Sequence, residues 1–189
     1  RRGTESLAPA MRALLDGEKL APAADEALAR VPDGLASVEE GADSEGIRPS
    51  AAIQEAIKKG GIRGVVRWIV DLRNSRGGNM WPALAGIGSL LGEGTAGYFI
   101  DSANAATPWG YKNGAAWLQD DTVAQIEAPY SMNAASARVA VLTDVGVASS
   151  GEAIAIAFRG RPNTRSFGTA TCGLSTAVSQ ITLSDRGQA

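Results

Sequence analysis

The sequence of 189 residues contains no histidine. Histidine is the side chain that most often serves as a general base near neutral pH, and it is the commonest protein ligand of transition metals. Its absence excludes any mechanism in which a histidine of this chain accepts a proton. It also excludes a histidine-rich metal site.

Cysteine and net charge are scarce too. The one cysteine, Cys172, can form no disulfide within the chain, which leaves the redox compartment open. Eighteen basic against 20 acidic residues give a net charge of −2, so there is no positive excess to attract a nucleic acid. No apolar run approaches the roughly 20 residues that span a bilayer, and no integral membrane segment is expected.

The composition is that of an ordinary globular domain, with 44% apolar and 20% charged residues. Residues 1–48 hold two helical patterns and then an acidic stretch, so they predict a helical arm with an exposed linker. Residues 49–189 predict a separate α/β core. The chain begins with Arg1 and ends soon after an apolar stretch, which we interpret as a fragment or a processed piece.

Helices and strands alternate within the predicted core. A first helix is expected to begin at Ser50, a suitable N-cap, and to end at Gly60-Gly61. Its apolar face would hold Ile53, Ala56 and Ile57. The pattern then predicts a largely buried strand over 64–72, a helix over 80–91, an irregular β excursion over 95–130, a strand over 138–143, a helix over 153–158 and a short strand over 164–167. Two strand–turn–helix units indicate an α/β fold.

Paired glycines, Gly77 and Gly78, follow the first predicted strand. Because they have no side chains, their backbone N–H groups could face an anionic ligand. On spacing alone, a tight turn that only connects strand and helix is favoured, since short glycine motifs also match by chance.

The second constellation is Ser149-Ser150-Gly151-Glu152, between a predicted strand and a predicted helix. At a helix N-terminus, backbone N–H groups and the helix dipole favour negative charge, which suits a nucleophile whose attack creates an oxyanion. Ser-x-x-Glu is also a capping box, with Ser149 as the N-cap and Glu152 reaching back, and this interpretation is favoured. The two interpretations are compatible.

The third constellation, residues 169–176, is rich in small and hydroxylic side chains. It is typical of a loop that lines a site or only connects elements. Within it, Cys172 is interpreted as a small buried hydrophobic residue rather than a nucleophile.

These motifs together resemble the tail-specific, or C-terminal-processing, serine peptidases, nearest the branch of the nisin-resistance proteins. The resemblance covers about residues 49–189 and depends on all the motifs, because none is specific alone. In chain order they are Asp71-Leu72-Arg73-Asn74, Gly77-Gly78-Asn79-Met80-Trp81-Pro82, Val141-Leu142-Thr143-Asp144, Ala148-Ser149-Ser150-Gly151-Glu152, Phe158-Arg159-Gly160-Arg161-Pro162-Asn163-Thr164-Arg165-Ser166-Phe167-Gly168, and Thr171 with Gly173-Leu174-Ser175-Thr176.

The resemblance implies a Clp-protease/crotonase-like α/β core that hydrolyses a polypeptide substrate through a serine acyl-enzyme. It implies no metal or organic cofactor, and a secreted or periplasmic location. The implied nucleophile is Ser149. The implied oxyanion hole combines the backbone N–H of Gly77 or Gly78 with that of Ser150, while Glu152 and Thr171 would support the site.

The general base departs from the family pattern. Classical members carry a lysine 25 residues after the serine, where this chain has Leu174. The branch with a Gly-Leu-Ser-Thr loop resembles enzymes that use an upstream histidine, and Asp33 or a neighbour falls near that place here. None of the four lysines (Lys19, Lys58, Lys59 and Lys112) is assigned to the site. The family usually continues with a further strand after residue 185, so a C-terminal truncation is expected.

Three explanations of the missing base remain open. A segment that carries the histidine is absent, the chain is a variant that lost its base, or it is a module that binds peptides or lipids without hydrolysing them. An acyl-CoA enzyme of the crotonase type ranks last, because its chemistry does not need a serine–glutamate turn. Arg73 is expected to form a structural ion pair with Asp71, and Trp81 to pack in the core.

Overall fold

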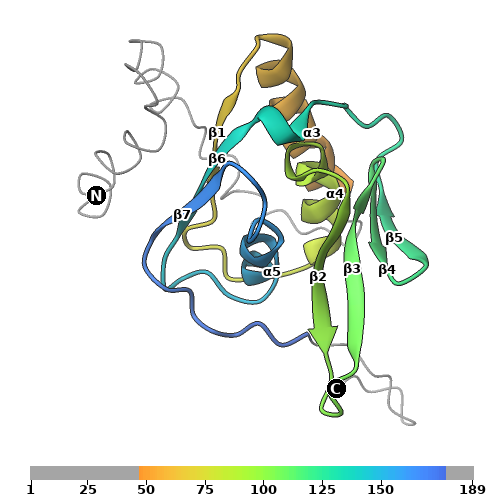
Figure 1. The fold of residues 1–189 in the computed structure, drawn as a ribbon, viewed down its shortest axis with the longest axis vertical. Helices are drawn as coiled ribbons and strands as arrows, with labels where there is room; N and C mark the ends of the chain where they lie inside the picture. The colour runs from red at the N-terminus through yellow and green to blue at the C-terminus, as the bar shows by residue number, and fades with distance from the viewer. Residues whose placement is uncertain (1–46, 178–189) are drawn as a thin grey trace.

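The computed structural model describes residues 47–177 (Figure 1). The predicted arm of residues 1–48 lies outside this range except for its last two residues. The elements are α3 (Ile47–Ile62), β1 (Arg67–Asp71), α4 (Met80–Leu91), β2 (Gly94–Ile100), β3 (Ala106–Lys112), β4 (Ala115–Leu118), β5 (Asp121–Gln125), the short 3-10 helix η2 (Ala134–Ser136), β6 (Arg138–Thr143), α5 (Ser150–Ala157) and β7 (Thr164–Gly168). No helix within the described range is long and apolar enough to cross a membrane.

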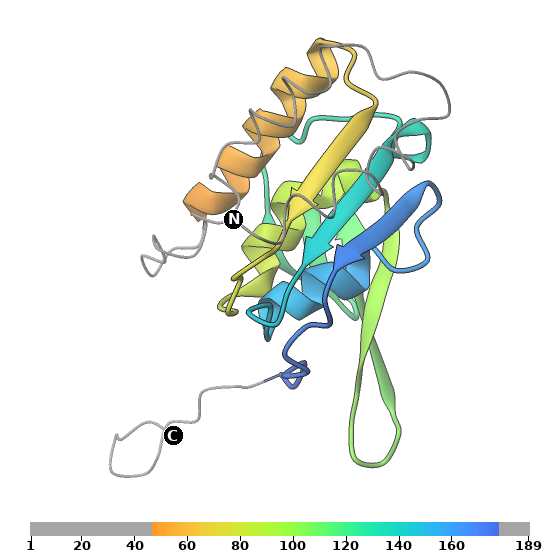
Figure 2. The ribbon, with the colours of Figure 1, turned by 90° about the vertical axis from the view of Figure 1, so that its left-hand side faces the viewer.

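A parallel sheet carries the two predicted strand–turn–helix units. Its strand order is β1-β6-β7, and Val70 pairs with Val141. In Figure 2 these strands lie in front of α4 and α5. Val70, Val139 and Val141 are fully buried and belong to the same core cluster as residues of both helices. Each such side chain contributes roughly 1.5–3 kcal/mol on burial.

The first strand, β1, is shorter and less buried than predicted. It spans Arg67–Asp71 rather than 64–72, and only Val70 is fully buried. Val65 and Val66 precede the strand and are 38% and 54% exposed. The cause is position, because β1 lies at the edge of the sheet that the described strands form. A run of β-branched residues does not distinguish an edge strand from a central one.

The central element is α4, in which ten of the 12 residues are buried. It packs against α3, α5 and the strands β3 to β5. A helix that is apolar on every side is stable only when it is surrounded, as here. The helix predicted over 80–91 is therefore confirmed, and the side-chain oxygen of Asn79 caps it by accepting the N–H of Trp81 at 3.1 Å.

The 95–130 region is more regular than predicted. It forms a second, antiparallel sheet in the order β2-β3-β4-β5, with irregularities in register at Thr95–Gly97 and Ala116–Trp117. Trp109 and Tyr111 are only 2% and 3% exposed, so they are core residues. An added methyl on Gly88 of α4 would lie 2.0 Å from the Tyr111 ring, which shows how closely helix and sheet approach.

Helix α3 differs from the prediction at both ends. It begins at Ile47, so Ser50 is no N-cap but a buried residue whose hydroxyl donates to the Pro82 carbonyl at 2.7 Å. It also continues through Gly60-Gly61 to Ile62. These glycines make room for aromatic rings, because added methyls would lie 2.4 Å from the Trp68 ring and 2.3 Å from the Tyr130 hydroxyl.

Candidate active site

Two loops meet at the carboxyl edge of the parallel sheet. Residues 72–79 follow β1, and residues 144–149 follow β6. Because β1 and β6 are parallel neighbours, their following loops lie side by side, as is usual for ligand sites in α/β sheets. A backbone bond from Ala148 N–H to the Ser75 carbonyl (2.8 Å) joins the two loops, and a bond from Leu72 N–H to the Leu142 carbonyl (3.0 Å) joins the first loop to β6.

Ser149 lies at the turn from β6 into α5, in a backbone conformation that side chains rarely adopt. Its φ is 51° and its ψ is −119°. Such strain costs of order 1–3 kcal/mol and is concentrated at functional sites. The same kind of strained strand-to-helix turn exposes the serine of α/β-hydrolases. Ser149 occupies the N-cap position, but its side chain makes no capping hydrogen bond, so the predicted capping box is wrong.

Gly77 lies directly against Ser149. A methyl added to Gly77 would be 2.6 Å from the Ser149 Cβ and 3.2 Å from its Oγ. Gly77 also has a φ of 119°, which favours glycine. The glycine pair is therefore more than a connecting turn: one member provides the space in which the serine hydroxyl lies. Its neighbour Gly78 has a φ of 131° and faces open space.

Ser150 is the first residue of α5. The first N–H groups of a helix have no partner within the helix and form its positive end. The Ser150 N–H is the first of these groups after Ser149. An apposed glycine loop and helix N-terminus are the two sources of backbone donors that an oxyanion site needs.

Glu152 is buried, with 4% of its surface exposed. It does not reach back along the helix. Its Oε1 accepts the N–H of Gly173 at 2.7 Å, while its Oε2 has no hydrogen-bond partner in the described part of the chain. Glu152 therefore ties residues 169–177 to the first turn of α5.

Residues 169–177 run beside the serine loop. Ser149 N–H donates to the Leu174 carbonyl, and Cys172 N–H donates to the Val147 carbonyl, both at 2.8 Å. Thr171 is half-buried in this segment. Cys172 is exposed, so its interpretation as a buried residue is wrong. Backbone pairing along the loop leaves the thiol outside the core.

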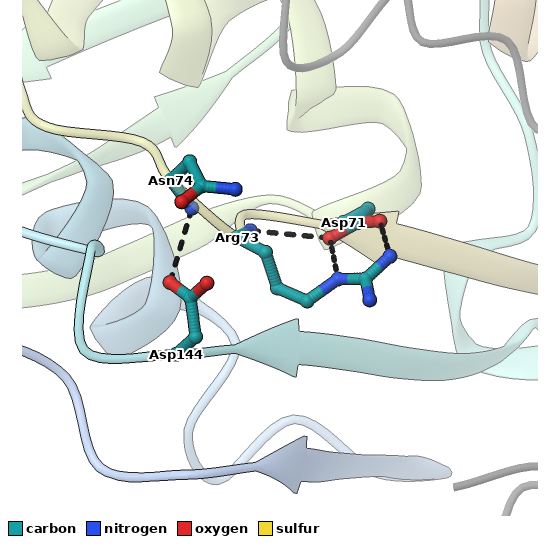
Figure 3. Close-up of polar contacts among 4 residues, drawn as sticks. All are labelled: Asp71, Arg73, Asn74 and Asp144. Atoms are coloured by element: carbon teal, nitrogen blue, oxygen red, sulfur yellow. Dashed lines mark hydrogen bonds and ion pairs between the residues drawn. The ribbon is translucent and has the colours of Figure 1, made fainter. Parts of the chain in front are cut away.

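A charged cluster supports the same edge of the sheet (Figure 3). Arg73 pairs with Asp71 through two parallel bonds, Nε–Oδ1 at 2.8 Å and Nη2–Oδ2 at 2.5 Å, which confirms the predicted ion pair. The hydrogen bond with Asp71 raises the pKa of Arg73, and the charges of Asp71 and Asp144 act in the same direction. Asp144 Oδ1 accepts the N–H groups of Asn74 and Gly146, each at 3.0 Å.

Asp144 is the functional candidate that the sequence reasoning missed. The sequence feature that could have identified it is its position. It is an acidic residue directly after a buried strand, and therefore lies at the edge of the sheet where the site forms. Gly146 and Gly151 were missed as well. Added methyls there would lie 3.0 Å from the Asn74 Cα and 2.6 Å from the Ser75 Oγ, so both glycines allow the loops to touch.

The lysines within the described range lie away from Ser149. Lys58 and Lys59 are exposed near the C-terminus of α3, which precedes the start of β1 and so lies at the opposite edge of the sheet. Lys59 forms an ion pair with Glu55 at 3.7 Å. Lys112 is exposed at the far end of β3, beside the C-terminus of α4. Lys19 and Asp33 lie outside the described residues.

Comparisons with known proteins show which family and fold this chain resembles. A family model described as peptidase family S41 matches residues 38–189. The nisin-resistance protein of Lactococcus lactis subsp. lactis is 30% identical over 145 residues, which cover 77% of this chain and 44% of that protein. A solved structure of a lipoprotein from Streptococcus agalactiae matches with a TM-score of 0.61 and 25% identity, covering 77% of this chain and 47% of that one. The chain thus spans about half the length of these relatives.

Proposed function

The chain belongs to peptidase family S41, and from this premise we propose that it is the catalytic core of a serine peptidase with Ser149 as nucleophile. One observation carries the proposal: a serine in a strained strand-to-helix turn, with its hydroxyl beside a glycine loop. A capping or packing role requires neither feature.

The proposed oxyanion hole joins the two loops. When the Ser149 oxygen attacks a peptide carbonyl, the carbonyl oxygen becomes negative. The N–H of Gly77 or Gly78 would donate to that oxygen from one side, and the N–H of Ser150 from the other. Loss of one such donor typically costs about 3–4 kcal/mol of transition-state stabilisation. The tetrahedral intermediate would then break its C–N bond, so that the amine portion of the substrate leaves with the proton that the serine gave up and the acyl group stays on Ser149. Water would hydrolyse this acyl-enzyme and restore the serine hydroxyl.

Glu152 and Thr171 would support this site from behind. Glu152 holds Gly173, and the next residue, Leu174, accepts the N–H of Ser149. Through these two bonds, the buried carboxylate would set the position of the serine backbone. Thr171 lies earlier in the same segment.

Family and fold extend the proposal to substrate and location. We infer that the parallel sheet with α4 and α5 is a Clp-protease/crotonase-like core, supported by the family match and by the likeness to the streptococcal lipoprotein. A polypeptide cleaved near its C-terminus, outside the cytoplasm, is the substrate that this family and that lipoprotein suggest.

A second candidate function is a peptide-binding module that does not hydrolyse. It is favoured by one observation: the sequence contains no histidine, and the described lysines lie away from Ser149. A serine hydroxyl is a weak nucleophile unless a base removes its proton.

Covalent labelling distinguishes the two functions. A fluorophosphonate should attach to Ser149, and mass spectrometry of the digested protein should locate the adduct there. Ser149→Ala should remove the adduct, whereas Ser102→Ala, at an exposed serine in the β2–β3 turn, should keep it. Equal labelling of the wild type and Ser149→Ala would refute Ser149 as nucleophile. Saturable peptide binding without any adduct would favour the binding module.

A further inference from the structure

A single carboxylate joins the two loops of the proposed site. Asp144 follows β6 directly, and its Oδ1 accepts two backbone N–H groups. One belongs to Gly146 in its own loop, and the other to Asn74 in the loop after β1, both at 3.0 Å (Figure 3). Bonds from backbone N–H groups to a charged acceptor are roughly twice as strong as neutral ones.

The Asn74 bond lies close to the proposed oxyanion donors. Asn74 is three residues before Gly77 and has a φ of 64°, so the chain reverses there. One residue later, the Ser75 carbonyl accepts the N–H of Ala148, the residue before Ser149. The glycine loop is thus held to the serine loop at its beginning and its middle, before Gly77 reaches the Ser149 side chain.

The two loops approach each other closely around this bond. Gly146 faces the Asn74 Cα, and Gly151 faces Ser75, so closely that neither has room for a methyl. Position matters at this scale, because an oxyanion donor works only within about 2.7–3.1 Å of the developing charge.

We propose that Asp144 is a positioning residue that sets the separation between the glycine-loop amides and Ser149. This inference rests on the proposed function, since it names a residue that acts through the oxyanion site and does not touch substrate. The Asp144 carboxylate also lies near the Arg73 guanidinium. Arg73, however, is already paired with both carboxylate oxygens of Asp71. The backbone bonds of Asp144, and not an ion pair, therefore carry the role.

Two substitutions separate the cross-loop bond from the local turn. Asp144→Asn keeps a side-chain oxygen at the same reach. Asp144→Ser has a side chain one atom shorter, which can still accept from Gly146 in a local turn but does not reach Asn74. Asp120→Asn and Asp120→Ser, at an exposed aspartate in the β4–β5 turn, are matched controls.

Amide hydrogen exchange, followed by NMR, measures the bond itself. In Asp144→Ser, the Asn74 amide should exchange about 10-fold faster or more than in the Asp120 variants, the factor expected for a lost bond to a charged acceptor. In Asp144→Asn the increase should be clearly smaller, about 5-fold or less. Unchanged exchange in Asp144→Ser would refute the clamp, and a melting temperature recorded beside it identifies a variant that has simply unfolded.

Fluorophosphonate labelling measures the consequence at Ser149. Asp144→Ser should lower the maximal labelling rate about 10-fold or more, with little change in the reagent concentration at half-maximal rate, and Asp144→Asn should recover most of it. Faster Asn74 exchange with an unchanged labelling rate would overturn the positioning role. If the wild type is not labelled, the proposed function fails, and the exchange rates still decide whether Asp144 joins the loops.

Discussion

Ser149 combines a positive φ of 51° with a negative ψ of −119°, a backbone conformation that only glycine adopts without strain. A non-glycine residue remains there only when the surrounding structure holds it, and here the Leu174 carbonyl, the start of α5 and Gly77 do so. The strained backbone at this position lowers the stability of the fold but places the serine hydroxyl where it lies. Such a loss of stability for the sake of function occurs at many active sites.

That strain predicts an inverted order of stability. At position 149, glycine should be more stable than alanine by about 1 kcal/mol, because relief of strain exceeds the entropy cost of glycine in the unfolded chain. At the neighbouring helical position 150, alanine should be more stable than glycine by about 0.5–1 kcal/mol. Urea unfolding of Ser149→Gly, Ser149→Ala, Ser150→Gly and Ser150→Ala measures both differences. The same order at both positions would contradict the strain.

A second prediction compares the paired glycines. Gly77→Ala should destabilise the fold by about 2 kcal/mol or more, because it adds a 2.6 Å contact with Ser149 to the cost of a positive φ. Gly78→Ala has the same backbone cost but open space around the methyl, so its loss should be smaller. Gly77→Ala should also slow the labelling of Ser149 about 10-fold or more. Equal stability losses in urea unfolding would mean that the contact is easily relieved.

At the scale of single residues, the sequence could predict which motifs would meet but not how. Local spacing alone favoured a connecting turn at Gly77 and a capping box at Ser149; the family resemblance put the two residues in one site, and the structure brings them into contact. Glu152 was expected to cap its own helix and instead bonds Gly173, 21 residues away. That partner depends on where residues 169–177 return, which local spacing does not encode.

At the scale of elements, Arg161 fixes the C-terminus of α4. Its guanidinium donates to the carbonyls of Leu90 and Leu91 at the end of that helix, and to those of Ala134 and Ala137 around η2. Burial lowers the pKa of Arg161, and no carboxylate offsets it among the groups that act on this side chain. The terminal helix carbonyls, which carry partial negative charge, take the place of a counter-ion.

Removal of this side chain should be costly. Arg161→Ala leaves several inward carbonyls without a donor and should lower the free energy of unfolding by about 2–4 kcal/mol. Arg161→Lys should recover little, because an ammonium cannot reproduce the planar fork of donors. Arg159→Ala, at an exposed arginine two residues earlier, should change stability by less than about 0.5 kcal/mol. Full recovery by lysine would show that charge alone matters.

The elements that were predicted well are the ones that local pattern determines. The bounds of α4 and β6 match because each is a mostly apolar run with a clear boundary: α4 lies between Asn79 and Gly92, and the apolar residues of β6 lie between Arg138 and Thr143. The end of α3 was predicted too early. Gly60 and Gly61 do not end the helix but leave space for the side chains of Trp68 and Tyr130. The antiparallel sheet was predicted only as an irregular β region, because its glycines suggested turns. Two of them, Gly97 and Gly110, instead lie within strands and make room for the rings of Trp109 and Trp117.

At the scale of the whole molecule, α4 separates two regions. The carboxyl edge of the parallel sheet, with the proposed site, lies near its N-terminal end. At its other end is a pocket of about 210 Å³ lined in part by Ser89, Glu93 and Tyr111. Burial there raises the pKa of Tyr111. The described residues thus supply the proposed site with a nucleophile and backbone donors, while their lysines remain on other surfaces.

This distribution predicts how the chain should respond to pH and to an added base. With no histidine to titrate near pH 6.5, the labelling rate of Ser149 should rise with pH without an inflection between pH 6 and 7. Neutral imidazole in solution should accelerate the hydrolysis of a small activated ester, because it can take the serine proton in place of the histidine that the sequence lacks. Ser149→Ala measures the direct reaction of imidazole with the ester, and the difference between the two proteins should grow with imidazole concentration. If the difference in hydrolysis rate between the two proteins stays constant as imidazole is added, proton removal does not limit the reaction.

In the pH profile, an inflection of the labelling rate near pH 6.5 would require an acidic group with a strongly raised pKa at the site.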